Sequence, residues 1–114
     1  MPYVQMNTNS TLTATQKETL MQRAAAMITV IPSKTPERTM VQINDGVSMY
    51  FACNGEPCMK VLIELFHEAP YEAKQEYLQK LFALIQETAG IPQNRIYLTY
   101  QAHEEWGSGG DLRR

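Results

Sequence analysis

Ile31-Pro32-Ser33-Lys34-Thr35-Pro36-Glu37-Arg38 is the stretch that decides the fold, because a shorter form of it returns as Ile91-Pro92-Gln93-Asn94-Arg95. In each copy an Ile-Pro pair ends a helical pattern and an arginine precedes a strand pattern, and the two prolines stand sixty residues apart. The chain is therefore predicted to hold two strand–helix–strand units. Each unit requires its two strands to pair in parallel through a right-handed crossover.

Hydrophobic periodicity predicts four strands and two helices. The strands are expected from residue 2 or 3 to 7 and over 39–44, 59–66 and 95–101, with helices over 15–31 and 70–89. A capping box formed by Thr15 and Glu18 is expected to open the first helix. A further short strand is expected around 49–52, and the glycine-containing tail after residue 101 gives no strong pattern.

These elements predict an α+β fold: two repeated β-α-β units form a four-stranded sheet with two helices on one face. A length of 114 residues fits one domain, residues 1–114, with one core. The other sheet face carries Leu62 and Phe66, and no remaining segment is long enough to bury it. Another copy of the same chain is the expected cover.

The charge and cysteine content of the chain bear on which partners it can bind. Ten basic and twelve acidic side chains give a net charge of −2, so the chain has no basic field for a nucleic acid or an anionic membrane. No apolar run is long enough to span a bilayer and no secretory leader is recognised, so a cytoplasmic protein is expected, with leaderless export left open. Cys53 and Cys58 fit neither a redox motif nor a zinc knuckle and are expected to be reduced thiols, with no metal or cofactor.

Pro2 is the candidate catalytic residue. Removal of Met1, which a small second residue permits, would leave Pro2 with a free secondary amine at the start of a strand that holds it in place. An α-amino group titrates near 7.7 to 8.0, and burial or a neighbouring cation lowers its pKa further. A base with a pKa close to ambient pH accelerates proton transfer by on the order of 10² to 10⁴. If Met1 is retained, this nitrogen is an amide and the mechanism is impossible.

The chain resembles the macrophage migration inhibitory factor family of the tautomerase superfamily. The resemblance rests on the segments 2–9 (PYVQMNTN), 55–58 (GEPC) and 94–100 (NRIYLTY), and it covers most of the length. It implies a homotrimer with Pro2 as the proton-transfer base in a pocket at each subunit boundary. It also implies keto–enol tautomerisation of phenylpyruvate-like α-keto acids.

Four further residues match pocket positions of that family. Lys34 matches a lysine that binds the substrate carboxylate, and its charge would also help to keep Pro2 unprotonated. Tyr97 matches a tyrosine contributed by the adjacent subunit, although an interface tyrosine without a catalytic role would occupy the same place. Phe66 and Thr99 match positions where many relatives have isoleucine and asparagine.

The chain differs from the family at two places, and two alternative functions remain open. Val61 stands where mammalian relatives have a second cysteine, so no thiol–disulfide activity is predicted. In the C-terminal segment, which closes the pocket with apolar residues in many relatives, Glu104 and Glu105 place carboxylates near the pocket mouth, where they would repel an acid unless they point outward. Trp106 is a candidate for the pocket wall or for ordinary packing. One alternative is a binding or signalling protein with little turnover. The other is a dehalogenase or decarboxylase on the same scaffold, for which one of the two glutamates would activate water.

Overall fold

The computed structural model describes all of residues 1–114 and places the two repeated units side by side in one four-stranded sheet. The elements in chain order are β1 (Pro2–Thr8), α1 (Ala14–Ala26), β2 (Met40–Asn44), β3 (Met59–Phe66), α2 (Tyr71–Ala89), β4 (Ile96–His103), β5 (Trp106–Ser108) and β6 (Asp111–Arg113). Short 3₁₀ turns occupy Met27–Val30, Pro36–Arg38 and Gln93–Arg95.

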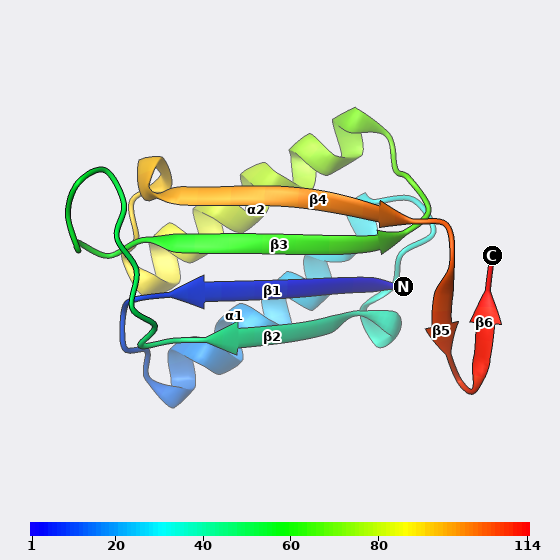
Figure 1. The fold of residues 1–114 in the computed structure, drawn as a ribbon, viewed down its shortest axis with the longest axis horizontal. Coiled ribbons are helices and arrows are strands. Elements are labelled where there is room, and N and C mark those ends of the chain that lie inside the picture. Colours follow the sequence, from blue (N-terminus) through cyan, green and yellow to red (C-terminus); the bar gives the residue numbers. More distant parts are fainter.

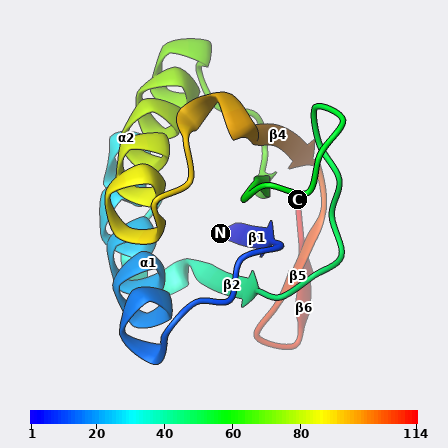
Figure 2. The same cartoon turned by 90° about the vertical axis from the view of Figure 1, so that its left-hand side faces the viewer.

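The order of strands in the sheet is β2-β1-β3-β4. The pairs β1–β2 and β3–β4 are parallel, as the two crossovers require, and the units meet through the antiparallel pair β1–β3. Both helices cover the same face of the sheet, as Figure 2 shows in the view along the strands. The predicted fold class is therefore confirmed.

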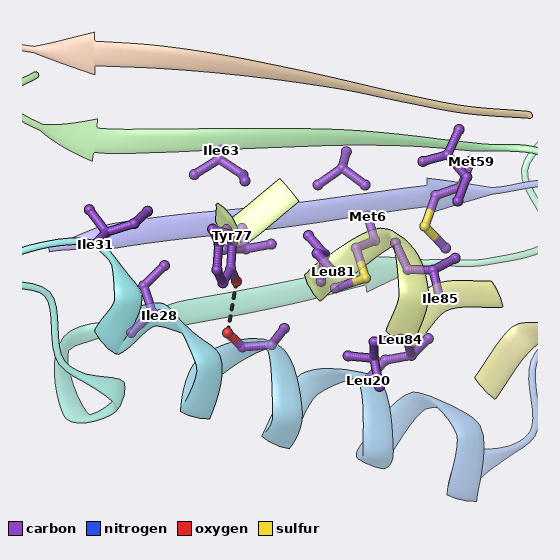
Figure 3. Close-up of a cluster of buried hydrophobic side chains, with 14 of the residues drawn as sticks. Met6, Leu20, Ile28, Ile31, Met59, Ile63, Tyr77, Leu81, Leu84 and Ile85 are labelled. Carbon is purple, nitrogen blue, oxygen red and sulfur yellow. Dashed lines mark hydrogen bonds between the residues drawn. The ribbon is translucent and has the colours of Figure 1, made fainter. Parts of the chain in front are cut away.

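The core lies between this face and the helices (Figure 3). Burial alternates along β1 and β3, so that Val4 and Met6 face the helices together with Val61 and Ile63. From α2, the fully buried Tyr77 reaches across to α1 and donates its hydroxyl to the carbonyl oxygen of Ala24 at 2.7 Å. Burial raises the pKa of Tyr77, so this hydroxyl stays a proton donor.

The prediction for the start of α1 is wrong by two residues. Thr13 has an extended backbone and caps the helix, its hydroxyl accepting from the Gln16 amide at 3.1 Å while the Gln16 side chain accepts from the Thr13 amide at 2.8 Å. Thr15 already lies within the helix. The capping box is present, but glutamine takes the place expected for a glutamate because either side chain can accept that bond.

The strand expected around residues 49–52 does not form. Ala52 and Cys53 have φ of 54° and 63°, a left-handed conformation that ends an extended chain, and only an isolated bridge joins Phe51 to Asn54. The tail is more regular than predicted, since β5 and β6 form a hairpin around Gly109 and Gly110, with φ of 62° and 90°.

The sheet face opposite the helices is uncovered in one chain, but it is more polar than its two predicted apolar residues suggested. Its central part is a network of amide and hydroxyl side chains from β1 and β2. The members are Tyr3, Gln5, Asn7, Gln42 and Asn44. Leu62 and Phe66 are each only half-buried beside it. Neither helix of the fold is long and apolar enough to cross a membrane.

Candidate functional site

The start of the chain is fixed by the sheet. Pro2 is buried at the first position of β1 and pairs with Leu65 of β3, while the carbonyl oxygen of Met1 accepts from the Phe66 amide at 3.3 Å. The N-terminus lies at the same end of the sheet as the β5–β6 hairpin (Figure 1). Ladder hydrogen bonds therefore hold the N-terminal amine in place.

The loop between α1 and β2 brings two cations to this end. The Lys34 ammonium donates to the carbonyl oxygen of Phe66 at 2.9 Å, beside the residue that holds Met1. Ser33, with φ of 65°, turns the chain before it. Arg38 ends the 3₁₀ turn Pro36–Arg38, in which its amide donates to the carbonyl oxygen of Thr35 at 3.2 Å. Both cations thus stand on short, hydrogen-bonded turns.

These surroundings lower the pKa of the N-terminal amine to about 6. Partial burial makes the largest contribution because it disfavours the charged form, and the Lys34 ammonium and the Arg38 guanidinium lower the pKa further. At neutral pH the amine is therefore mostly unprotonated and able to accept a proton. The amine belongs to Met1 here, and the nitrogen of Pro2 lies one residue further into the same environment.

Two cavities adjoin at Met1. The larger, about 930 Å³, lies on the uncovered side of the sheet under the C-terminal hairpin, and its walls include Pro2 and Trp106. The smaller, about 400 Å³, is lined by Lys34 and Phe66. Met1 and Arg38 line both. Loss of Met1 would thus join the two spaces and expose the nitrogen of Pro2 where they meet.

The five predicted site residues fall into two groups. Pro2, Lys34 and Phe66 gather at the N-terminal end of β1, whereas on β4 Tyr97 lies toward the opposite end of the sheet and Thr99 near its middle. Leu65, the partner of Pro2, and Lys60, the partner of Tyr97, are five residues apart on β3, which is roughly 17 Å at the rise of a strand. One chain therefore does not bring Tyr97 to its own Pro2.

Tyr97 is nonetheless held in a defined position. Its side chain is exposed, and its ring packs edge-on against Phe51 with centroids 4.8 Å apart. Arg95 fixes that loop by donating to the carbonyl oxygens of Phe51, Glu56 and Pro57 at 3.2, 2.9 and 2.8 Å. Tyr97 is therefore presented outward on a braced surface.

The two glutamates of the tail each contact another side chain. Glu104 contacts the His67 ring nitrogen at 3.5 Å, and Glu105 contacts Arg114 at 3.6 Å, so the charge of Glu105 is compensated in part. Trp106 is half-buried and forms part of the wall of the larger cavity. It is the tail residue that could contact a bound ring.

Sequence reasoning missed two features of the site. In the sequence, Arg38 stands out only as the end of the repeated loop, because its place beside the amine depends on the 3₁₀ turn that precedes β2. The Glu64 carboxylate and the His103 ring nitrogen lie 2.6 Å apart in the wall of the larger cavity. They are 39 residues apart, and only the parallel register of β3 and β4 brings them together.

The metal-ligating and thiol side chains of the chain are dispersed. No group of three or more histidine, cysteine, aspartate or glutamate residues is placed to hold a metal ion. Cys53 is exposed, Cys58 is buried, and both are free thiols. The N-terminal amine and its two neighbouring cations therefore define the candidate active site.

Comparison with known proteins agrees with this geometry. The sequence profile of the Macrophage migration inhibitory factor (MIF) family matches residues 1–110. A D-dopachrome decarboxylase of Xenopus tropicalis is 29% identical over 110 residues, which span 96% of this chain and 92% of the relative.

Two solved structures show how widely the fold is shared. The crystal structure of Leishmania major MIF2 superposes with a TM-score of 0.92 at 21% identity, covering 99% of this chain and 97% of that one. The crystal structure of Pt0534 inactivated by 2-oxo-3-pentynoate superposes with a TM-score of 0.83 at 18% identity, covering 95% and 93%.

Proposed function

Because the chain belongs to the macrophage migration inhibitory factor family, we propose that it is a keto–enol tautomerase of phenylpyruvate-like α-keto acids, with Pro2 as the general acid and base after Met1 is removed. The observation that carries this proposal is the N-terminal amine. It is partly buried, flanked by Lys34 and Arg38, and has a pKa lowered to about 6 at the point where two cavities adjoin.

One base is enough for the reaction, because the same amine removes the proton and returns it. The neutral amine of Pro2 removes a proton from the carbon next to the keto group, and the electrons of that C–H bond form the new C=C bond as the carbonyl oxygen becomes an enolate. The enolate oxygen then takes the proton back from the Pro2 ammonium, which gives the enol and restores the amine. No external reactant is required.

Lys34 holds the substrate carboxylate beside the base. Its ammonium faces the smaller cavity and has no carboxylate partner within the chain, so it is free to pair with an anionic ligand. Phe66 packs on His67 with ring centroids 4.0 Å apart and offers an apolar wall in the same cavity. An acid with an apolar body fits these two neighbours.

The complete site requires neighbouring subunits. Tyr97 lies roughly 17 Å along the sheet from the Pro2 of its own chain and Thr99 roughly 10 Å, so we infer that they reach a pocket as parts of another copy. We therefore propose a homotrimer in which the outward-facing Tyr97 of one subunit steadies the developing enol at the Pro2 of the next. Thr99, whose hydroxyl accepts from Lys60 at 2.7 Å, belongs to the same edge.

The relatives support the class of substrate. 2-Oxo-3-pentynoate, which inactivates Pt0534, is itself an α-keto acid. Its alkyne is a reagent for this chain: a neutral amine adds to the alkyne carbon β to the ketone, a C–N bond forms, and the α-carbon takes up the proton. Peptide mass spectrometry should locate the adduct on the nitrogen of Pro2. An adduct on Lys34 alone, with tautomerase activity intact, would contradict the assignment of the base.

The kinetic test uses phenylenolpyruvate. Intact-mass measurement first establishes that Met1 is absent, and the rate of ketonisation is then compared between the wild type and Pro2→Gly. We expect the variant to be at least about 100-fold slower, since general base catalysis by a positioned group supplies on the order of 10² to 10⁴. Equal rates would remove Pro2 from the mechanism. Negligible turnover by the mature wild type would favour the binding or signalling alternative.

A further inference from the structure

Two cations at the larger cavity have no assigned contact with the substrate in the tautomerisation of a simple aryl keto acid. Arg38 lines both cavities and Arg113 lines the larger one. Neither takes part in an ion pair within the chain. Arg113 makes one long hydrogen bond, to the carbonyl oxygen of Ser108 at 3.4 Å. A guanidinium carries five donors, so both side chains keep most of their capacity for a ligand.

The carboxylates in the same walls do not cancel these charges. Glu64 contacts the His103 ring at 2.6 Å, and Glu105 contacts Arg114. Glu68, in the wall of the smaller cavity, pairs with Lys74 at 2.8 Å. Glu37 is the remaining acid, next to Arg38 in the turn. The joined cavities would thus present Lys34, Arg38 and Arg113 against one carboxylate, that of Glu37, which has no side-chain partner within the chain. The charges of Lys34 and Arg38 both favour the neutral form of the N-terminal amine, which lies between the two cavities.

The cations lie where the two ends of a bound substrate would be. Lys34 lines only the smaller cavity, Arg113 lines only the larger, and Arg38 faces both beside Pro2. A ligand with its first carboxylate at Lys34 has its reacting carbon at Pro2 and its far end in the larger cavity. That end meets guanidinium groups, which bind carboxylates in a planar, two-pronged geometry that an ammonium cannot match.

The backbone that carries Arg38 is braced for such a role. The hydroxyl of Thr39 donates to the carbonyl oxygen of Thr35 at 2.8 Å, and the Thr39 amide donates to Pro36 at 3.1 Å. The position of Arg38 is therefore set before a ligand binds, which reduces the entropy lost on binding.

We propose that the larger cavity binds a second carboxylate of the substrate through Arg38, with Arg113 assisting, so that the preferred substrates are α-keto acids with an anionic group at their far end. This inference rests on the proposed function for the orientation of the substrate, and it narrows the phenylpyruvate-like class to its dicarboxylic members.

The binding test uses two unreactive acids that differ only in the second carboxylate, 3-phenylpropanoate and 3-(4-carboxyphenyl)propanoate. By calorimetry with the mature protein, the dicarboxylate should bind about tenfold more tightly or better, as expected for a hydrogen bond to a charged partner. Arg38→Gln should abolish that preference. Arg23→Gln, an exposed arginine on α1, is the matched control and should retain it.

The kinetic test compares phenylenolpyruvate with its 4-carboxy derivative. Arg38→Gln should raise KM for the 4-carboxy substrate about tenfold and that for phenylenolpyruvate less than about threefold. If Arg38 acts only through the amine, the variant changes KM for both substrates by the same factor, and the ratio of the two KM values stays constant. Equal binding of the two acids by the wild type, or equal loss of both in Arg38→Gln, would overturn the inference.

The two proposals fail in different ways. If the mature protein ketonises neither substrate but still prefers the dicarboxylate in calorimetry, the tautomerase proposal fails and the second carboxylate site stands. If it ketonises both substrates with Pro2-dependent rates and shows no preference that depends on Arg38, the tautomerase stands and the second site is wrong.

Discussion

The N-terminal amine shows how one residue acquires chemistry from its neighbours. An exposed α-amino group is largely protonated at neutral pH. At the start of β1, partial burial and the charges of Lys34 and Arg38 lower its pKa to about 6. Each effect is modest, but all act in the same direction. An ordinary α-amino group therefore becomes a base that is mostly unprotonated at neutral pH.

The pH dependence of the reaction follows from the sign of this shift. The neutral amine is the active form, so kcat/KM should increase as pH rises through the pKa of the Pro2 amine and then level off. The burial and the two cations that lower the pKa of the Met1 amine also hold the pKa of the Pro2 amine below its ordinary value. In Lys34→Gln one cation is lost, the pKa of the amine rises, and the increase should move to higher pH. KM for the keto acid should also rise about tenfold because the carboxylate loses its partner.

Lys80→Gln is the matched control for this variant, since Lys80 is exposed on α2. Its pH profile and KM should equal those of the wild type. A Lys34→Gln profile with an unchanged midpoint would show that Lys34 does not act on the base.

Only part of the site could be predicted from the sequence. Pro2 and Lys34 could be predicted because both match positions of the family. Each also lies next to a strand or helix that the periodicity predicts. Arg38 and the Glu64–His103 pair were missed, because their placement depends on a turn and on strand register. Whether Tyr97 and Thr99 act in the site stays a prediction, since the strand register separates both from the Pro2 of their own chain.

At the scale of elements, the two helices are tied together by one buried hydrogen bond. Tyr77 of α2 donates to the carbonyl oxygen of Ala24 in α1 at 2.7 Å. Tyr77→Phe should lower the free energy of unfolding by about 1 kcal/mol, because the carbonyl loses its side-chain partner in a buried place. Urea denaturation measures this change.

Tyr71→Phe provides the control, since the Tyr71 side chain is 73% exposed at the first position of α2. Its unfolding midpoint should not change. If Tyr77→Phe were as stable as Tyr71→Phe, the bond between the helices would contribute nothing to stability.

The elements were predicted well where periodicity is long and poorly where it is short. The four sheet strands and both helices appear within a few residues of their expected bounds, because each has a buried face that dictates apolar spacing. The capping box was predicted two residues too late, because several threonines near the start of α1 could each cap the helix. The β5–β6 hairpin was missed because its strands have three residues each, too few to show a period.

At the scale of the whole molecule, the two halves of the proposed site lie at different ends of one sheet. Pro2 marks one end and Tyr97 lies toward the other, so a closed ring of copies would join unlike ends around it. The polar network on the uncovered sheet face suits a surface that meets water or another polar face. This arrangement predicts that activity depends on assembly.

Complementation between two inactive variants tests that dependence. Pro2→Gly and Tyr97→Ala should each have low activity alone. When they are unfolded, mixed in equal amounts and refolded, about a quarter of the sites in random trimers combine an intact Pro2 with an intact Tyr97 from another subunit. Recovery of about that fraction of the wild-type rate is expected. No recovery, with trimers confirmed by light scattering, would place Tyr97 outside the site.

The most direct test of the central claim changes only the state of the Pro2 nitrogen. A chain with one glycine in front of Pro2 keeps every side chain of the site but converts that nitrogen to an amide. Ketonisation of phenylenolpyruvate is measured for this chain and for the mature chain, with both masses verified. The proposed base predicts a loss of at least about 100-fold with an unchanged unfolding temperature. Equal rates for the two chains would contradict it.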